Sequence, residues 1–281
     1  MSQPVIETPS GKGAGDENFP VGSFLLPARL RPHVFTYYAF ARAIDDIADN
    51  PQTPPQDKIA RLNAMDDALL GRDKNPDISV SKATKLRQSM LETGVDLAHA
   101  SDLISAFRQD AIKSRYQTWD ELINYCLRSA SPVGRYLLEL HGEDKGHFQY
   151  SDALCNALQV INHLQDCADD LMEMDRCYLP LDWCNAHGAR VEMLKEKASP
   201  VALRAVQLQC LDGTEKLLEI ADKLPGKLKS KSLAMESGVI ISVAWKLCEK
   251  LRKHDPVAMR VELSKPQFLF CGLKGAIKGL I

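Results

Sequence analysis

Apolar residues recur along most of this chain at intervals of three and four positions, the spacing that gathers them on one face of a helix. In segment 56–70 the residues of the predicted inner face are Ile59, Leu62, Met65, Leu69 and Leu70. Gly71 follows this segment directly and is expected to end the helix. A period-two alternation of apolar and polar residues, which would indicate strands, does not persist between turn residues. The pattern therefore predicts an all-α protein.

Prolines, glycines and capping residues divide the rest of the chain into further predicted helices. These are expected at residues 32–49, 81–92, 96–115, 118–141, 147–172, 200–224, 227–252 and 266–281. Thr118 and Glu121 form a capping box, and the Ser-Pro-Val-Gly sequence at 131–134 should bend the helix that this box opens. Residues 1–15 have little apolar content and are expected to form a disordered tail. Residues 16–281 would then form a single helical domain.

The net charge and the cysteines of the chain indicate which partners and which cellular location to expect. The 281 residues carry a net charge of -2, with lysine and arginine spread along the chain, so no nucleic-acid partner is expected. Eight cysteines occur without a Cys-x-x-Cys pair, and no signal peptide precedes them. We therefore expect buried free thiols and a cytoplasmic location. No apolar run reaches the roughly 18 residues that a membrane-spanning helix needs.

The stretch 38–49 places carboxylates inside an otherwise apolar helical run. Asp45 and Asp49 are four residues apart and therefore share a helix face with Arg42 and Tyr38. Like charges at this spacing repel each other, and the cost rises if the face turns inward. A cationic group is therefore expected between the two carboxylates.

A second polar face lies far downstream, in segment 147–172. Its residues follow at steps of three, four and four, and they are Gln159, Asn162, Asp166 and Asp170. Carboxylate and amide oxygens are ligands for Mg²⁺, which typically completes its shell with phosphate oxygens of a substrate. A single Asp-x-x-x-Asp pair is more often a solvated helix face. Two such pairs in one chain favour a Mg²⁺ site that binds a polyphosphate.

In three motifs the chain resembles the squalene and phytoene synthase family of head-to-head prenyltransferases. The motifs are Tyr-x-Phe-x-Arg-x-x-Asp-Asp-x-x-Asp from Tyr38, Gln-x-x-Asn-x-x-x-Asp-x-x-x-Asp from Gln159, and Arg176-Cys-Tyr178-Leu-Pro180. The likeness in order and spacing extends from about residue 17 to about residue 265. It implies an isoprenoid-synthase-type helical bundle with a central cavity. The break at 131–134 would either line the prenyl cavity, as in the family, or be a plain packing kink.

The resemblance also implies a role for each motif residue. The Mg²⁺ ligands would be Asp45, Asp49, Asn162, Asp166 and Asp170. The side chains that bind the prenyl diphosphate substrate would be Arg42, Arg176, Gln159 and Arg260. The residues at the reacting centre would be Tyr38, Tyr178, Phe19 and Asn18. Asp46 and Asp169 would be outer ligands or salt-bridge partners. Arg260 and Lys265 would either add phosphate contacts from the C-terminal region or, as is slightly favoured, lie on a solvated face.

A finer resemblance concerns the branch of the family. Glu17-Asn18-Phe19-Pro20 and Leu25-Leu26-Pro27 most resemble the bacterial members that form hydroxysqualene for hopanoid biosynthesis. Condensing members carry a Ser-rich, basic stretch before the first Phe, whereas the acidic Asp16-Glu17-Asn18 here would repel a diphosphate. No nicotinamide fingerprint is present. These features favour conversion of presqualene diphosphate and water to hydroxysqualene, with the substrate handed over by a presqualene diphosphate synthase.

Two other functions stay open. A presqualene diphosphate or dehydrosqualene synthase would use the same motifs to condense two farnesyl diphosphates. A non-catalytic binding protein on the same fold, like the relatives that assist respiratory complex assembly, is the more distant alternative. It is disfavoured because such relatives lose metal-ligand aspartates, whereas this chain has both sets.

The C-terminal segment 267–281 is apolar, with only two lysines and no acidic residue. One expectation is an interfacial helix in peripheral contact with the inner face of the membrane, which would shorten the path of an oily product into lipid. The other is docking on the protein core. Three glycines weaken the segment as an isolated helix, and the two expectations are held equally.

Overall fold

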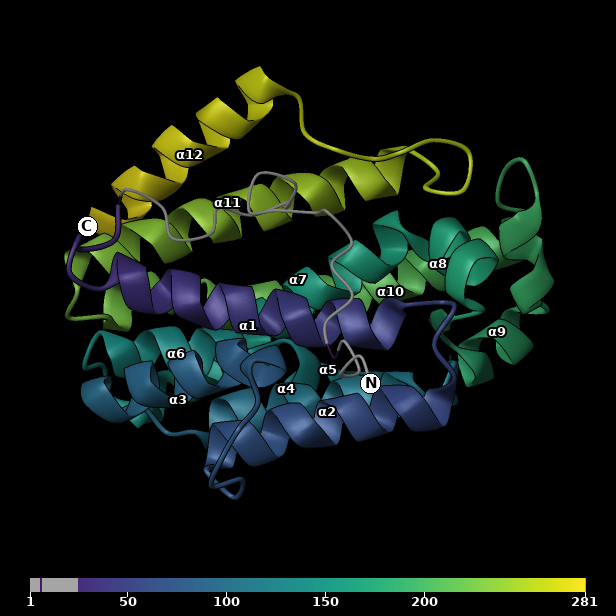
Figure 1. Cartoon of the computed structure of the whole chain (residues 1–281). Helices are drawn as coiled ribbons and strands as arrows, with labels where there is room; N and C mark the ends of the chain where they lie inside the picture. Colours follow the sequence, from purple (N-terminus) through teal and green to yellow (C-terminus); the bar gives the residue numbers. More distant parts are fainter. Residues whose placement is uncertain (1–5, 7–24, 281) are drawn as a thin grey trace. The chain divides into compact units, whose positions relative to one another are not determined.

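The computed structural model of the chain describes Ile6 and residues 25–280. Asn18, Phe19 and, except for Ile6, the predicted tail of residues 1–15 lie outside the described residues. Helices make up most of the described chain (Figure 1), which confirms the all-α prediction. The chain divides into two compact units: unit 1 is Met1–Lys113 with Arg135–Lys145, and unit 2 is Ser114–Gly134 with Gly146–Ile281.

Unit 1 is organised around its first helix. Its elements are α1 (Arg31–Asp49), α2 (Pro55–Leu70), η1 (Ile78–Val80), α3 (Ser81–Thr93) and α4 (Ala98–Asp110). Helix α1 packs on α2, α3 and α4, and buries Phe40 and Ile44 completely. Pro32 lies in the first turn of α1, and Gly71 ends α2 in the left-handed conformation, with φ of 69°. Both residues act as the sequence predicts.

Unit 2 has a core in which α7, α10 and α11 pack in succession. Its elements are β1 (Arg115–Tyr116), α5 (Trp119–Ser129), α7 (Phe148–Gln165), α8 (Cys167–Met174), β2 (Cys177–Pro180), α9 (Leu181–His187), η3 (Val191–Lys195), α10 (Val201–Ala221), η4 (Pro225–Lys227), α11 (Lys231–Lys253) and α12 (Lys265–Leu280). Two short elements cross the boundary of the units, α6 (Ser131–Leu140) and η2 (Lys145–His147). Leu203, Val206 and Leu211 of α10 are fully buried in this core.

The capping box at the start of α5 forms as predicted. The Thr118 hydroxyl accepts a hydrogen bond from the Glu121 backbone N–H at 3.2 Å, and the Glu121 carboxylate accepts one from the Gln117 N–H at 2.5 Å. Helix α5 then ends, and Ala130, with φ of -128°, separates it from α6. The predicted bend therefore occurs, as a break between two helices.

Gly134 indicates a packing role for the break between α5 and α6 within unit 2. A Cβ at this position would meet the side chains of Ser151 and Cys155 on α7. The glycine therefore allows the start of α6 to approach α7 closely. A buried hydrogen bond from the Ser131 hydroxyl to Asn156 Oδ1, at 2.9 Å, joins the same two helices. Of the two expectations for the 131–134 break, these contacts support the packing role.

Three expectations about secondary structure were wrong. No strand was expected, yet β1 and β2 form a parallel pair in which Arg115 lies opposite Cys177, and the Cys177 N–H donates to the Ser114 carbonyl at 2.9 Å. Strands this short cannot show a period-two pattern, so only their tertiary pairing reveals them. The helix expected at 147–172 is interrupted at Asp166, and the helix expected at 96–115 ends at Asp110.

All eight cysteines are free thiols, and all except Cys155 are buried, as the sequence predicts. Their apolar surroundings raise the pKa of several of them, to about 12 for Cys184 and Cys248. They act as small apolar side chains in the core of unit 2. Across the described residues, no helix is long and apolar enough to cross a membrane.

Candidate active site

The acidic face of α1 is the first part of the candidate site. Arg42 reaches two carboxylates from one turn below: its guanidinium pairs with Asp45 and, at 3.0 Å, with Asp46. Asp46 is buried, whereas the Asp45 side chain is 27% exposed. Arg42 is therefore a cationic partner of Asp45 and Asp46, whereas a cation between Asp45 and Asp49 stays a prediction. Tyr38 and Asp49 lie half-buried on the same helix face.

Negative charge remains in excess around Asp45. Burial raises the pKa of this carboxyl well above its usual value, and Asp49 raises it further, whereas Arg42 lowers it. Asp110, a buried residue at the end of α4, adds to the repulsion. Asp110 was not predicted, because it comes from a helix that is remote in sequence and outside the motif. A cation would relieve this repulsion.

The second acidic face is bent at its first aspartate. Asp166 has φ of -103° and ψ of 10°, and it separates α7 from α8. Its N–H still donates to the Asn162 carbonyl at 2.9 Å, and the Asp170 N–H donates to the Asp166 carbonyl at 2.8 Å. The bonds between residues four apart therefore continue through the break, and Asn162, Asp166 and Asp170 remain at half-buried positions. Asp169 is exposed.

The turn after α8 positions Arg176 and Tyr178. Asp175 ends α8 with φ of 51°, and its carboxylate pairs with Arg115 at 2.6 Å. The Arg176 N–H donates back to the Asp170 carbonyl at 3.1 Å, which links this turn to the acidic face. Arg176 is only 6% exposed, and Tyr178 follows it as a buried residue of β2. Unit 2 thus brings the predicted arginine and tyrosine to the same end of α8.

An aromatic cluster that the sequence did not predict surrounds Tyr178. Its ring stacks on the imidazole of His163, with ring centroids 3.5 Å apart, and lies 5.5 Å from Tyr116 and 5.8 Å from Tyr125. Burial and the charge of nearby Arg176 lower the pKa of His163 to about 3, so the imidazole is neutral near pH 7. The cluster offers stacked π faces beside the turn that carries Arg176.

Two further predicted residues lie near the second acidic face. Arg260 Nη1 is 3.9 Å from Asp166 Oδ1 and 63% exposed, so a loop after α11 brings a cation to the metal-ligand candidates. Gln159 Nε2 lies 3.3 Å from His163 Nε2. Lys265, the other residue considered with Arg260, is exposed at the start of α12.

The predicted site residues therefore fall into two groups, one in each unit. Unit 1 holds Tyr38, Arg42, Asp45 and Asp49 on α1. Unit 2 holds Gln159, Asn162, Asp166, Asp170, Arg176, Tyr178 and Arg260. Asn18 and Phe19 lie outside the described residues. Within the described ranges, no three His, Cys, Asp or Glu side chains are placed to hold a metal ion by themselves.

Comparison with known proteins assigns the chain to a family. The sequence model of the squalene/phytoene synthase family matches residues 13–267. A hydroxysqualene synthase of Zymomonas mobilis is 42% identical over 263 residues, which is 92% of this chain and 87% of that protein. A hydroxysqualene synthase of Rhodopseudomonas palustris is 41% identical over 268 residues, which is 94% of this chain and 89% of that protein.

Solved structures agree with this assignment. A squalene synthase, HpnC, from Alicyclobacillus acidocaldarius superposes with a TM-score of 0.72 at 28% identity, covering 83% of this chain and 87% of that one. A dehydrosqualene synthase shares the fold with a TM-score of 0.75 at 24% identity, covering 92% of this chain and 90% of that one. The motifs, the fold and these relatives lead to one conclusion: the chain belongs to the squalene/phytoene synthase family of isoprenoid-forming enzymes.

Proposed function

We propose that this protein is a hydroxysqualene synthase, which converts presqualene diphosphate and water into hydroxysqualene and diphosphate. The observation that carries the proposal is its identity of 38–42%, over 92–94% of the chain, to three relatives of that name. The acidic Asp16-Glu17 sequence supports it, because a second diphosphate would be repelled there. A site for one diphosphate suits presqualene diphosphate as the substrate. The corresponding pathway role is the supply of a squalene precursor for hopanoids.

The side chains present fit Mg²⁺ as the metal. Each group offers hard oxygen donors, two carboxylates on α1 and two carboxylates with an amide on α7 and α8, and Mg²⁺ prefers such ligands. Burial and then the charge of Asp49 raise the pKa of Asp45, and a bound cation would offset the repulsion between these carboxylates. Because neither group forms a complete site by itself, waters and substrate phosphate oxygens would fill the remaining positions.

The residues that would hold the metal are Asp45, Asp49, Asn162, Asp166 and Asp170. When bound, Mg²⁺ would neutralise the charge that develops on the leaving diphosphate. Arg42 and Arg176 provide guanidinium donors suited to phosphate oxygens. Arg176 is almost fully buried, so its charge acts in a region of low dielectric constant, where it stabilises an anion more strongly than in water.

The aromatic cluster is suited to the carbocation. Ionisation breaks the carbon–oxygen bond of the substrate, and the bonding electrons leave with the diphosphate. The faces of Tyr178, Tyr125 and Tyr116 carry the negative side of an aromatic quadrupole, which attracts a cation without reacting with it. Neutral His163 stacks against Tyr178 and adds no positive charge that would oppose the cation.

Capture by water then gives the alcohol. The water oxygen forms the new carbon–oxygen bond, and the proton that it loses passes to the diphosphate. No electron donor is needed, in agreement with the absence of a nicotinamide fingerprint from the sequence. The apolar core around the cluster limits the access of further water, so one capture event would dominate over random hydrolysis.

The test is product analysis in ¹⁸O-labelled water. Purified protein with Mg²⁺ and presqualene diphosphate should yield hydroxysqualene that carries the label, without any nicotinamide. An unlabelled hydrocarbon as the main product would overturn the proposal, as would product formation from farnesyl diphosphate as sole substrate. A folded protein that turns over neither substrate would favour the non-catalytic binding function. For substitutions of the candidate ligand carboxylates, the matched control is Glu219→Gln. It removes an exposed carboxylate from α10 and should leave turnover unchanged.

A further inference from the structure

Helix α12 is apolar on two opposite sides, and only one of them is covered within unit 2. The covered side carries small residues, Cys271, Gly275 and Gly279, which pack against α11. A Cβ at Gly275 would overlap the backbone of Gly238, and one at Gly279 would overlap the backbone of Ala234. The two helices therefore approach through their backbones, and Figure 1 shows α12 inclined to α11 and closest to it towards the C-terminal end of α12.

The opposite side of α12 exposes large apolar side chains. At about 100° per residue they form one continuous stripe. Its members are Leu269, Phe270, Leu273, Ile277 and Leu280. Leu269 is 65% exposed and Phe270 is 69% exposed. Single exposed apolar residues are ordinary on a protein surface, but a contiguous stripe along about three turns of one helix indicates a partner of apolar character.

The charges of α12 indicate what kind of partner this is. The helix contains Lys265, Lys274 and Lys278 and no acidic residue, although the whole chain has a net charge of -2. Lys274 and Lys278 each follow a residue of the stripe and so lie along its edge. Lys278 pairs with Asp222 at 2.8 Å, whereas Lys265 and Lys274 have no acidic partner among the described residues.

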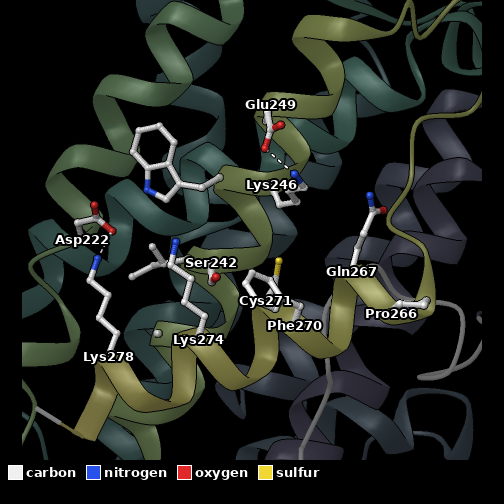
Figure 2. Close-up of a pocket in the computed structure, with 14 residues that line it drawn as sticks. Asp222, Ser242, Lys246, Glu249, Pro266, Gln267, Phe270, Cys271, Lys274 and Lys278 are labelled. Atoms are coloured by element: carbon white, nitrogen blue, oxygen red, sulfur yellow. Dashed lines mark hydrogen bonds and ion pairs between the residues drawn. The ribbon is translucent and has the colours of Figure 1, made fainter.

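A pocket opens beside the stripe. It lies between α11 and α12, has a volume of about 790 Å³, and does not include any of the candidate active-site residues in its lining. Figure 2 shows Phe270 and Lys274 of α12 at this pocket, together with Ser242 and Lys246 of α11. Trp245 adds an aromatic wall. An apolar edge with lysines beside it provides room for a lipid chain and an anionic headgroup next to the stripe.

We propose that the exposed face of α12 is a membrane-docking surface, which lies in the interface of a bilayer that contains anionic phospholipids. The stripe would enter the boundary between headgroups and acyl chains, and Lys265 and Lys274 would meet lipid phosphates. The opposite, glycine-rich face keeps the helix attached to α11, so the helix lies on the membrane without leaving the fold. The proposal does not depend on the reaction that the enzyme catalyses.

The test is flotation of the full-length protein with vesicles, in the absence of substrate. Vesicles of phosphatidylcholine and phosphatidylglycerol in equal parts should carry the wild type upward, and raised salt should weaken binding. The triple variant Leu269→Ser, Leu273→Ser and Ile277→Ser should bind at least about tenfold more weakly, because it removes apolar surface that would enter the bilayer. These side chains are exposed, so folding should be unaffected.

A matched control removes three apolar residues that are even more exposed, from elsewhere on the surface. The variant Ile78→Ser, Ile112→Ser and Val201→Ser changes positions that are 80%, 73% and 90% exposed, and it should float like the wild type. Equal binding by the α12 triple variant and the wild type would overturn the proposal. Failure of the wild type to bind vesicles would also overturn it. If, in addition, the wild type sediments as a dimer and the α12 triple variant as a monomer, a second copy of the chain covers the stripe instead of a membrane.

A second variant tests the charges separately. Lys265→Gln with Lys274→Gln should weaken binding to the mixed vesicles about tenfold to thirtyfold and remove the preference over pure phosphatidylcholine. Lys278 is left in place because it pairs with Asp222. Unchanged binding of this double variant would overturn the role of anionic lipid. Turnover of soluble substrate by every variant reports the catalytic function independently, so failure of one proposal is distinguishable from failure of the other.

Discussion

The phenol ring of Tyr178 lies flat on the imidazole of His163, with centroids 3.5 Å apart and ring planes inclined by 12°. Tyr178 comes from β2 and His163 from α7, one turn before Asp166. The stack therefore ties the strand after the metal-ligand candidates to the helix that carries them. It also fixes the direction of the π face that we assign to the carbocation.

Two replacements of Tyr178 should distinguish the contribution of its aromatic ring to the rate from that of its hydroxyl. Tyr178→Phe retains the aromatic face, and its kcat should stay within about threefold of the wild type. Tyr178→Leu removes the face and should lower kcat about tenfold to thirtyfold, the effect of losing a desolvated cation–π contact. Single-turnover rates with presqualene diphosphate, at a temperature where circular dichroism shows both variants folded, provide the measurement. Equal rates for the two variants would remove the aromatic face from the mechanism.

Asp45→Asn and Asp166→Asn should each abolish diphosphate release, with a loss of about a hundredfold or more. Without metal, Asp45→Asn should be as stable as the wild type or more stable, because it relieves the repulsion from Asp49. Added Mg²⁺ should raise the unfolding temperature of the wild type more than that of either variant. A wild-type rate in either variant, or an unchanged response to Mg²⁺, would contradict the ligand roles.

Two glycines of α12, three residues apart, should respond in opposite directions to alanine. A Cβ at Gly272 meets nothing within 4 Å, so Gly272→Ala should stabilise the protein by up to about 1 kcal/mol through helix propensity. A Cβ at Gly275 would overlap the backbone of α11, so Gly275→Ala should destabilise it by about 1–3 kcal/mol. Chemical denaturation measures both. Stabilisation by both substitutions would show that α12 is not docked on α11 in solution.

Asp255 should make the stability of unit 2 sensitive to acid. Burial raises the pKa of this carboxyl, but hydrogen bonds from the Ser199 hydroxyl and N–H, both at 2.6 Å, and from the Val257 N–H outweigh it and lower the pKa overall. A depressed pKa in the folded state means that the stabilisation is present above the unfolded-state pKa of about 3.9 and is lost as pH falls through the lower folded-state value.

Comparison of the wild type with Asp255→Asn checks this sign. At pH 7 the variant should be less stable by about 1–2 kcal/mol, since it loses bonds to a charged acceptor. The difference in free energy of unfolding should shrink at a pH well below about 4. A difference that grows in acid would contradict the lowered pKa. Denaturant titrations at the two pH values provide both free energies.

The ends of several helices followed from local sequence. Gly71 ends α2 because only a residue without a side chain adopts its φ of 69° at no cost, and the Thr118 hydroxyl caps α5 through an N–H three residues along. Such signals involve neighbouring residues only. The parallel pairing of Arg115 with Cys177 joins residues far apart in the chain, and no local pattern marks it.

The candidate site divides in the same way. The spacing of Asp45 and Asp49 follows from the helical repeat, and so does most of the face formed by Asn162, Asp166 and Asp170. The break between α7 and α8 at Asp166 does not follow from the helical repeat. Backbone hydrogen bonds between residues four apart continue through the break, and an aspartate is not a residue type that ends a helix by itself. The predicted roles of these residues stay predictions until substitutions test them.

The sequence by itself determined the helical class and the family, because these depend on residue type and on short, regular spacing. The tertiary structure decided which residues meet across distant segments: the stack of Tyr178 on His163, the charge of Asp110 near Asp45, and the side of α12 that is covered. Both sides of α12 are apolar, so hydrophobic pattern could not distinguish them. Only the glycine backbone fits against α11, and this steric fit leaves the large side chains exposed.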